Sequence, residues 1–560
     1  MSQNHGVTTS LRGFKILLFL VFLLEYSSPL LNAQQQRPSK NVIVMITDGT
    51  STSMLSIARW YQYYQNPNHQ ALTIDSLLRG LVKTFSSDAP IGDSAPTTSC
   101  YMTGHPSQTG FVSTYPVATD HDLVPVDATK AYQPMVTLLE AAKYKYGMST
   151  GIVVKCEFPH ATPADCAAHT YDRGDYPVIA KQMVHNNLDV VIAGGAQYLS
   201  EENETYLKQN NYEVIKNDYE AFRKSSSSQL WALLAPINIP YRIDADREQV
   251  PSLGEMTQKA LDILSKNDHG FFLMVEGSLV DWAAHDNDAK TAILEFLEFD
   301  KAVQVAFQFA VKEGNTTIVI LPDHANSGIS MGNSNSNGKY DRLSLESFFK
   351  PIENYRKSAW ECAEELNKMS LADADILLKK YYDIQLTDGE RQLLYKARNY
   401  KASPFPKEER SSLNLVRSLT KILYERTYFG FTTYGHTGDD VFFAGYHPQN
   451  DMPVGVFSNI ELNHYLCKQL NLEEQLDSLT TKLYMPHQEL FDDSYTVKTD
   501  SLAPDHFQLT VTKKRWKLVA HSYDNKVIIN NKEIQLSSLV GYMKKNKTFY
   551  LPADVMNFHP

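Results

Sequence analysis

The chain has 560 residues and a formal net charge of −11, with 43% hydrophobic and 21% charged residues. This length exceeds one simple core and predicts one large domain with insertions and a small appendage. The composition is that of a globular protein. The acidic balance argues against nucleic acid as a dedicated partner, because phosphate backbones attract basic surfaces.

The N-terminal segment has the parts of a secretory signal peptide. Arg12 and Lys15 precede an apolar run at residues 16–24, and Ala33 ends a short segment before three glutamines. The run is short for a membrane span, and a retained N-terminal anchor is the alternative. We therefore expect residues 1–33 to be removed on export, leaving a periplasmic or extracellular protein without a transmembrane span.

The five cysteines are scattered along the chain at Cys100, Cys156, Cys166, Cys362 and Cys467. Their odd number and the absence of a C-x-x-C pair indicate neither a thiolate zinc site nor a disulfide framework. Cys156 and Cys166 could pair in an oxidising compartment, a question that their spacing leaves open.

Five short, β-branched apolar runs predict strands at residues 41–47, 151–154, 189–192, 271–275 and 317–321. The runs are nearly unbroken rather than alternating, which is typical of strands covered on both faces. Helical patterns lie between them, for example at 135–144, 257–265 and 288–311. This alternation predicts an α/β fold with a central, mostly parallel sheet flanked by helices.

Two regions depart from this alternation. Residues 339–428, rich in Leu, Lys, Glu and Tyr, predict a mainly helical insertion between two parts of the core, 34–338 and 429–500. Beyond residue 501 a small β-rich C-terminal region, 501–560, is expected from short strand patterns at 506–512, 515–521 and 526–529. The insertion lies between two segments of the expected site, which favours a lid or crown, with a remote surface decoration as the alternative.

Acidic residues and histidines follow three of the predicted strands. Asp48 follows the first, Glu276 follows the fourth, and Asp323 and His324 follow the fifth after one proline. Ligands of open α/β sheets bind beyond the carboxyl ends of the strands, so these side chains should meet at one edge. A single Asp at a strand end is usually a helix N-cap, but three such ends together predict a ligand site.

Two further segments offer metal ligands. Asp281 and His285 are four residues apart, so on a helix they share one face and can bind one metal, with Glu276 able to reach a second cation. His436 lies in a glycine-flanked loop, where a side chain can approach a site closely. Each signal is weak alone, since an isolated Asp–His pair is ordinarily a solvated helix pair.

Ser94 is the candidate nucleophile. Its position predicts a helix N-cap, with Pro96 early in the helix that follows. A helix start collects free N–H groups and favours a bound phosphate, although capping alone is the simpler interpretation. No G-x-S-x-G elbow is present, and a serine activated by a metal needs no histidine base.

Five motifs, in this order, resemble the alkaline phosphatase family: ITDG (46–49), GDSAPTTS (92–99), EGSLVDWAAH (276–285), PDHANSG (322–328) and YGHTG (434–438). The resemblance covers about residues 41–330 and 430–447, and the motifs are jointly specific. It implies a metal-dependent phosphomonoesterase that acts on small phosphate monoesters through a phosphoserine. It leaves open whether the chain forms a homodimer.

Carried over position by position, the resemblance implies two zinc sites and a third site that is usually magnesium. The ligands of the first zinc would be Asp281, His285 and His436. The ligands of the second would be Asp48, Asp323, His324 and the Ser94 hydroxyl. The third site would take Asp48, Thr162 and Glu276, with His160 beside them. Two zinc ions would then clamp the attacking and leaving oxygens of an in-line displacement.

Arg173 matches the arginine that grips the phosphate oxygens in the family, and Asp93 matches the acid that orients it. A planar guanidinium suits two phosphate oxygens. His160 and Trp282 stand where well-known bacterial members have Asp and Lys, and Asn326 stands where many members have histidine. Because imidazole suits cobalt or zinc better than magnesium, Co²⁺ or another divalent ion is the alternative to Mg²⁺ at the third site.

Two other functions remain as alternatives. A phosphodiesterase or sulfatase could share this fold, but related diesterases commonly use a threonine nucleophile and lack the residues of the third site. The chain could also be a binding or surface module stabilised by metals, for which the β-rich C-terminal region would be the reason. A complete ligand set beside a nucleophile argues against that module. We therefore predict an exported alkaline phosphatase.

Overall fold

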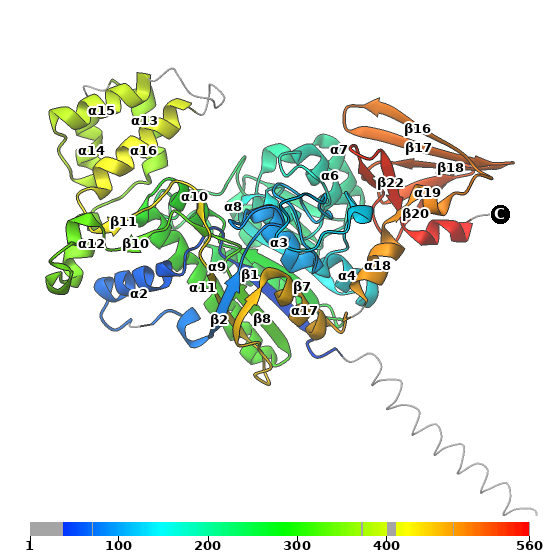
Figure 1. Ribbon diagram of the computed structural model, residues 1–560, viewed down its shortest axis with the longest axis horizontal. Coiled ribbons are helices and arrows are strands. Elements are labelled where there is room, and N and C mark those ends of the chain that lie inside the picture. The colour runs from blue at the N-terminus through cyan, green and yellow to red at the C-terminus, as the bar shows by residue number, and fades with distance from the viewer. Residues whose placement is uncertain (1–36, 70, 371–372, 400–409, 474, 559–560) are drawn as a thin grey trace, which may run out of the picture.

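The computed structural model describes residues 37–69, 71–370, 373–399, 410–473 and 475–558. The expected signal peptide, residues 1–33, lies outside these ranges. A central sheet with its helices occupies the middle of the molecule, helices of residues 345–424 stand at one end, and the C-terminal strands extend at the other (Figure 1). None of the helices in the described ranges is long and apolar enough to cross a membrane.

A ten-stranded sheet forms the centre, in the order β14-β2-β13-β8-β1-β7-β3-β4-β6-β5. All neighbouring strands are parallel except β13, which is antiparallel to both β2 and β8. In that order the strands span Gly455–Ser458, Leu78–Lys83, Val441–Tyr446, Thr316–Leu321, Asn41–Ile46, Phe271–Glu276, Ser149–Glu157, Val190–Gly194, Leu230–Leu233 and Glu213–Lys216.

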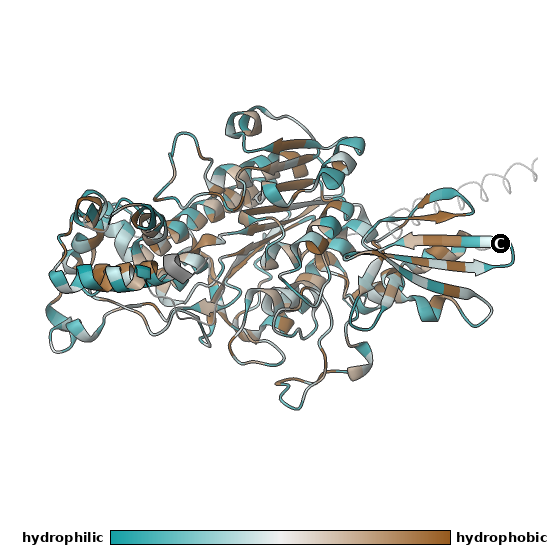
Figure 2. Cartoon of the chain, turned by 90° about the horizontal axis from the view of Figure 1, so that it is seen from above, coloured by the Kyte–Doolittle hydropathy of each residue, from teal (hydrophilic) through white to brown (hydrophobic). Residues whose placement is uncertain are grey.

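The five strands predicted from apolar runs are β1, β3, β4, β7 and β8, which are consecutive neighbours at the centre of this sheet. The prediction of an α/β fold with a mostly parallel sheet is therefore confirmed. Successive side chains of β1 enter two different buried clusters, Ile43 and Met45 on one face and Val42 and Val44 on the other. A strand buried on both faces needs apolar residues throughout, and Figure 2 shows these strands as apolar ribbons inside the molecule.

Helices cover both faces of the sheet. One face packs against α2 (Ser53–Gln65), α8 (Tyr219–Lys224), α9 (Leu253–Leu264), α10 (Leu279–His285) and α11 (Ala289–Glu313). The other face packs against α3 (Ser94–Thr103), α4 (Leu138–Tyr146), α5 (Ala161–Ala164), α6 (Tyr176–His185), α7 (Glu201–Gln209) and α17 (Asn459–Leu470). The three helices predicted by example correspond to α4, α9 and α11, with shifted bounds.

Residues 339–428 are mainly helical in their described part, as expected. The helices are α12 (Leu345–Glu353), α13 (Ala359–Lys368), α14 (Ala374–Tyr382), α15 (Asp388–Asn399) and α16 (Arg410–Tyr424). They stand together at one end of the molecule, beside α2 (Figure 1). Apolar residues of α12 to α16 join the same buried cluster as α2, α9 and α11, so this segment shares the core.

The C-terminal region consists of antiparallel strands. One sheet contains β16 (Thr496–Ala503), β17 (His506–Lys513), β18 (Trp516–His521), β19 (Lys526–Ile529) and β20 (Lys532–Gln535). A smaller sheet contains β15 (Met485–Pro486), β22 (Thr548–Leu551) and β21 (Gly541–Met543), beside α18 (Leu476–Leu483) and α19 (His487–Leu490). The longest of these strands that the sequence did not predict is β16, which is exposed along nearly its whole length and lacks an apolar pattern.

A buried ion-pair cluster fixes β3 to α11. The Lys155 ammonium lies 2.7 Å from a carboxylate oxygen of Glu295 and 3.0 Å from one of Glu298. All three side chains are at most 5% exposed. Because buried charges are tolerated only while their partners are present, this cluster depends on all three members.

Replacing Lys155 by methionine should therefore lower the free energy of unfolding by about 3–5 kcal/mol, since Glu295 and Glu298 lose their buried counter-charge. Urea unfolding of the parent and variant measures the difference. Lys224→Met is the matched control, because its ion pair with Glu220 is exposed on both sides and should change stability by less than about 0.5 kcal/mol. If Lys155→Met lowers the free energy of unfolding as little as the control does, this interpretation is wrong.

Candidate active site

Three strand ends gather carboxylates at one edge of the sheet. β1 pairs with β7 on one side and β8 on the other, so Asp48, Glu276 and Asp323 come from adjacent strands. All three residues have no exposed surface, and Asp281 on α10 is only 5% exposed. The structure thus brings together the acidic side chains that the strand-end pattern placed at this edge.

A first cluster combines Asp281, His285 and His436. The helix α10 puts Asp281 and His285 on one face, with Oδ2 and Nε2 3.4 Å apart. His436 comes from β12 (His436–Thr437), which pairs with β9 (Ala325–Asn326) and so returns the chain to the site after the helical segment. Its Nε2 lies 3.1 Å from His285 Nε2 and 3.8 Å from Asp281 Oδ1.

The hydrogen bonds of these two histidines define their tautomers. His285 Nδ1 donates to the Tyr434 carbonyl at 2.7 Å, and His436 Nδ1 donates to the Gly92 carbonyl at 2.9 Å. Because a carbonyl oxygen can only accept, each ring carries its proton on Nδ1 and has a lone pair on Nε2. In their neutral forms the two rings direct Nε2 lone pairs at each other 3.1 Å apart, and a shared proton or a bound metal ion removes this repulsion. Two imidazoles and a carboxylate are a donor set that fits zinc.

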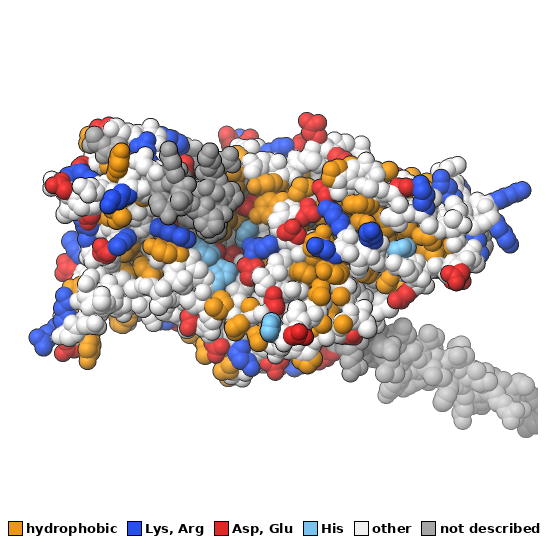
Figure 3. Space-filling model, turned by 45° about the horizontal axis from the view of Figure 1, so that its top comes forward, with side chains coloured by type: hydrophobic (Ala, Val, Ile, Leu, Met, Phe, Trp, Pro, Cys, Tyr) orange, Lys and Arg blue, Asp and Glu red, His pale blue; other side chains and the backbone are white. Residues whose placement is uncertain are grey.

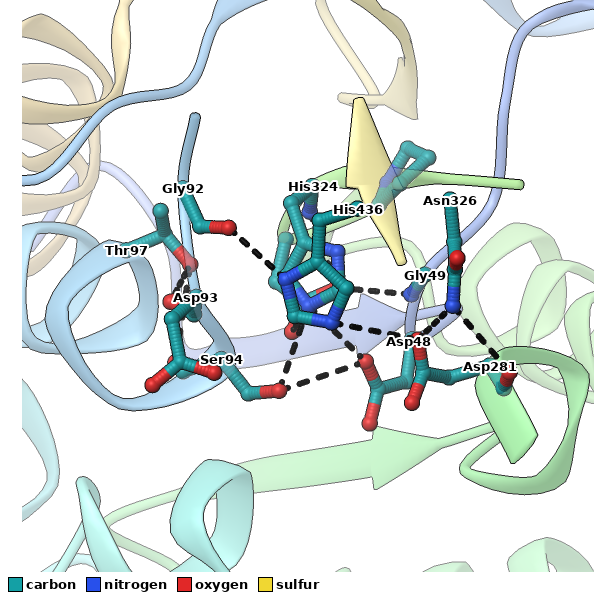
Figure 4. A network of polar contacts seen from close by, with 12 residues as sticks. Asp48, Gly49, Gly92, Asp93, Ser94, Thr97, Asp281, His324, Asn326 and His436 are labelled. Carbon is teal, nitrogen blue, oxygen red and sulfur yellow. Dashed lines mark hydrogen bonds and ion pairs between the residues drawn. The ribbon is translucent and has the colours of Figure 1, made fainter. Parts of the chain in front are cut away.

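A second cluster surrounds Ser94 (Figure 4). Ser94 Oγ lies 3.4 Å from Asp48 Oδ1 and 3.2 Å from His324 Nε2. His324 Nε2 also lies 3.4 Å from Asp48 Oδ1 and 3.5 Å from Asp323 Oδ2. The remaining oxygen of Asp48 and Oδ2 of Asp323 are buried and accept no hydrogen bond from the described residues. Buried carboxylate oxygens without a donor fit a bound cation.

The prediction that Ser94 is a helix N-cap was wrong by one residue. α3 begins at Ser94, and the N-cap is Asp93, whose extended backbone places its carbonyl oxygen to accept the Thr97 N–H at 3.1 Å. The Asp93 side chain does not cap the helix but pairs with Arg173. Ser94 therefore stands on the first turn of a ten-residue helix, with its hydroxyl facing the second cluster.

A third cluster lies on the Glu276 side of Asp48. The donor atoms of Cys156, His160 and Glu276 all lie within 4.8 Å of one another. Glu276 Oε1 and the hydroxyl of Thr162 are buried there without a hydrogen-bond partner among the described residues. The oxygen donors of this cluster fit a magnesium-type ion. Its sulfur and imidazole are not typical ligands of magnesium.

Cys156 received no site role from the sequence. No local sequence pattern could have found it, because its place depends on strand register: Val154 pairs with Glu276, and Cys156 is two residues further along β3. Alternate residues of a strand share one face, so Cys156 faces the same side as Glu276. All five cysteines are buried and unpaired, so the disulfide left open between Cys156 and Cys166 is absent.

Arg173 and Asp93 line the site as an ion pair, with side chains 28% and 22% exposed. Burial opposes both charges, but each partner stabilises the other, so the pKa of Asp93 is lowered and that of Arg173 is raised. A second guanidinium nitrogen donates to His160 Nε2 at 3.2 Å, and Trp282 packs edge-on against this imidazole. Arg173 is thereby held in place before any substrate arrives.

The buried carboxylates strongly perturb one another. Burial raises the pKa of Asp48 well above its usual range, and the charges of Asp323, Asp281 and Glu276 raise it further. Burial also raises the pKa of Glu276 to about 8. Burial also raises the pKa of Asp281, but positive charge on the neighbouring imidazoles and the hydrogen bond from Asn326 together lower it below its usual range. Without a cation, the raised pKa values of Asp48 and Glu276 favour their protonated forms, whereas a bound cation would favour the charged carboxylates.

Two neutral groups position the carboxylates. Asn326 donates its side-chain N–H to Asp281 Oδ1 at 2.7 Å. Gly49 donates its backbone N–H to Asp323 Oδ1 at 3.0 Å and has a φ of +57°. A Cβ on Gly49 would lie 2.0 Å from Asp281 Oδ1, so only glycine allows this close approach.

Figure 3 shows histidine side chains in a hollow on one face of the molecule, between the helical end and the centre. An α/β sheet that gathers carboxylates, imidazoles and a serine at one edge has the features of a metal-dependent hydrolase. A family model described as alkaline phosphatase matches residues 39–472, and the chain belongs to this family. It is therefore a phosphomonoester hydrolase by class.

Known relatives agree with this assignment. The chain is 31% identical to alkaline phosphatase 3 of Bacillus subtilis over 466 residues, which cover 79% of this chain and 93% of the relative. It is 27% identical to the repressible alkaline phosphatase of Saccharomyces cerevisiae, with 80% of this chain and 83% of that protein covered.

Solved structures show the same fold. A cold-active alkaline phosphatase from Shewanella sp. superposes with a TM-score of 0.65 at 29% identity, covering 77% of this chain and 99% of that chain. An alkaline phosphatase from Thermus thermophilus gives a TM-score of 0.67 at 21% identity, covering 80% and 96%, and supports the fold alone. The family model ends at residue 472, before the C-terminal strands.

His436→Ala should lower the zinc content of the protein by about one ion per chain, because the first cluster loses one of its two imidazoles. The measurement is elemental analysis of metal-free protein re-equilibrated with zinc and separated from free metal. His464→Ala is the matched control, since His464 is exposed on α17 and outside the clusters. An unchanged zinc content in His436→Ala means that the first cluster is not a zinc site.

Proposed function

We propose that the chain hydrolyses phosphate monoesters through a covalent phosphoserine on Ser94. The observation that carries this proposal is Ser94 Oγ, buried 3.4 Å from Asp48 and 3.2 Å from His324 on the first turn of α3. The same turn offers free backbone N–H groups and the positive end of the helix, which favour a phosphate. Arg173 adds a guanidinium within the same site.

The three clusters would hold the cations that the alkaline phosphatase family implies. Zinc would be held by Asp281, His285 and His436 in the first cluster and by Asp48, Asp323, His324 and Ser94 in the second. A magnesium-type ion would be held by Asp48, Thr162 and Glu276, with His160 at its edge. When bound, these ions supply positive charge that stabilises the serine alkoxide and the departing alkoxide.

The protein groups position and transfer the phosphoryl group. Ser94 Oγ forms the new bond to phosphorus as the ester oxygen departs, and water later cleaves the phosphoserine to release phosphate and restore Ser94. The Arg173 guanidinium binds two phosphate oxygens, a geometry that a single lysine charge cannot reproduce. Asp93 keeps the guanidinium oriented through their ion pair.

A phosphate monoester fits this arrangement better than a diester or sulfate ester. A monoester dianion presents more charged oxygens to the Arg173 fork and the three clusters than a diester does. A binding or surface module is also less well supported, because it needs no nucleophile beside the clusters. We further propose that the protein acts after export, in the periplasm or outside the cell, on the strength of the signal-peptide pattern in residues 1–33.

Ser94→Ala should abolish the covalent phosphoenzyme and lower turnover of a chromogenic monoester by at least about 1,000-fold, as loss of a nucleophile does elsewhere. Acid quenching with radiolabelled phosphate monitors the covalent form, and product release monitors turnover. The zinc content should stay near that of the parent, because the other ligands of the second cluster remain. Radiolabelled phosphate bound covalently to the Ser94→Ala protein would show that another residue is the nucleophile.

Arg173→Ala should lower kcat/KM for a monoester by about 100-fold, the scale of losing one stabilising donor, and for a matched diester by clearly less. The reason is that a diester lacks one anionic oxygen for the guanidinium to bind. Arg173→Lys keeps the positive charge but loses the planar guanidinium that binds two oxygens. Its kcat/KM for the monoester should fall between those of the parent and Arg173→Ala. Equal losses on both substrates would favour the phosphodiesterase alternative.

A further inference from the structure

The third cluster contains a donor that a magnesium site does not use. Cys156 Sγ lies 3.4 Å from Glu276 Oε2, and the donor atoms of Cys156, His160 and Glu276 fall within 4.8 Å of one another. Cys156 and Glu276 have no exposed surface, so the thiol is inside the cluster and shielded from solvent.

Unpaired oxygens point to a cation at this place rather than to a completed hydrogen-bond network. Glu276 Oε1, the Thr162 hydroxyl and one oxygen of Asp48 are buried without a hydrogen-bond partner in the described part of the chain. Each of these residues is fully buried, so the missing partner is not bulk water. Buried polar atoms are nearly always satisfied, and these three atoms belong to neighbouring residues, since Glu276 interacts with both Thr162 and Asp48.

His160 is partly committed elsewhere. Its Nε2 accepts a hydrogen bond from the Arg173 guanidinium, which places the ring proton on Nδ1 in this arrangement. A nitrogen that carries a proton cannot bind a metal. While the hydrogen bond from Arg173 to His160 persists, the Cys156 sulfur is the donor of the third cluster that is not an oxygen and is available to a metal.

We propose that Cys156 is a thiolate ligand of the third cation and makes this site select zinc or cobalt over magnesium. The inference rests on the proposed function, since it concerns the third cation of that same site. Soft sulfur favours zinc-like ions, whereas magnesium binds oxygen almost exclusively. On binding, the sulfur–metal bond replaces the S–H bond, and the proton leaves to solvent.

Cobalt provides the direct test, because a thiolate bound to cobalt produces a near-ultraviolet charge-transfer absorption. The metal-free enzyme is first given two equivalents of zinc and then titrated with cobalt. The parent should develop the sulfur-to-cobalt band, saturating at one cobalt per chain. The first and second clusters contain only oxygen and nitrogen donors, so cobalt in either would not give this band.

Cys156→Ser should lose the band, and its cobalt affinity should fall by at least about tenfold, the lower end of the effect of losing even an outer partner. Its magnesium affinity should change less, because an oxygen donor replaces the sulfur. Cys166→Ser is the matched control and should keep the band, since Cys166 is also buried but lies outside the donor groups, and its sulfur lies 4.0 Å from the Thr162 carbonyl.

A parent enzyme that takes up no cobalt beside its two zinc ions, or takes up one cobalt without the band, overturns the proposal. A band that survives in Cys156→Ser overturns it as well. If that variant does not fold, the parent spectrum and Cys156→Ala decide. A thiol that only donates its hydrogen bond to Glu276 would give no band. Monoesterase activity of the parent is measured alongside: activity without the band removes this inference alone, whereas the band without activity removes the proposed function.

Discussion

Four buried carboxylates at one edge of the sheet are the constraint on which the site depends. Asp48, Glu276 and Asp323 end adjacent parallel strands, and Asp281 stands on the helix that follows one of them. Removing each ionised carboxylate from water costs several kcal/mol unless charge or hydrogen bonds compensate. The strands cannot relax this arrangement, because both faces of the sheet are packed against helices.

The surroundings of the carboxylates follow from that constraint. Asn326 and Gly49 each donate a hydrogen bond to one of them, and Gly49 leaves room for the close approach of Asp281. The histidines are held through Nδ1 by backbone carbonyls, so that Nε2 lone pairs face the carboxylates. These contacts still leave buried oxygens unpaired. A site with too many acceptors and too few donors fits cations, and that is why its chemistry is expected to depend on metals.

The central strands of the sheet could be predicted because their burial leaves a pattern within each strand's own sequence. A strand buried on both faces must be apolar throughout, so β1, β3, β4, β7 and β8 appear as unbroken runs. The outer strands are less regular: β2 carries charged residues and is only partly buried, and β14 has no buried residue. Their places depend on pairing with strands far away in the chain, which no local pattern encodes.

The site was predictable in part. Asp48, Glu276 and Asp323 could be found because they directly follow strands, but the carbonyls of Gly92 and Tyr434 that orient two histidines depend on loops meeting in space. Adjacent residues with equal capping preference explain the misplaced start of α3, since Asp and Ser both favour the N-cap.

Cys156 was missed for a different reason. Sequence rules judge a cysteine by its spacing to other cysteines, whereas its neighbours in the fold are His160 and Glu276. Only the pairing of β3 with β7 reveals that relation.

The central claim is that these buried carboxylates and histidines hold cations beside a nucleophilic serine. Anomalous diffraction from crystals grown with zinc and vanadate, a phosphate mimic, tests it most directly. We expect one zinc among Asp281, His285 and His436, a second among Asp48, Asp323 and His324, and vanadate bonded to Ser94 Oγ. Zinc located outside these clusters, or vanadate bound away from Ser94, would contradict it.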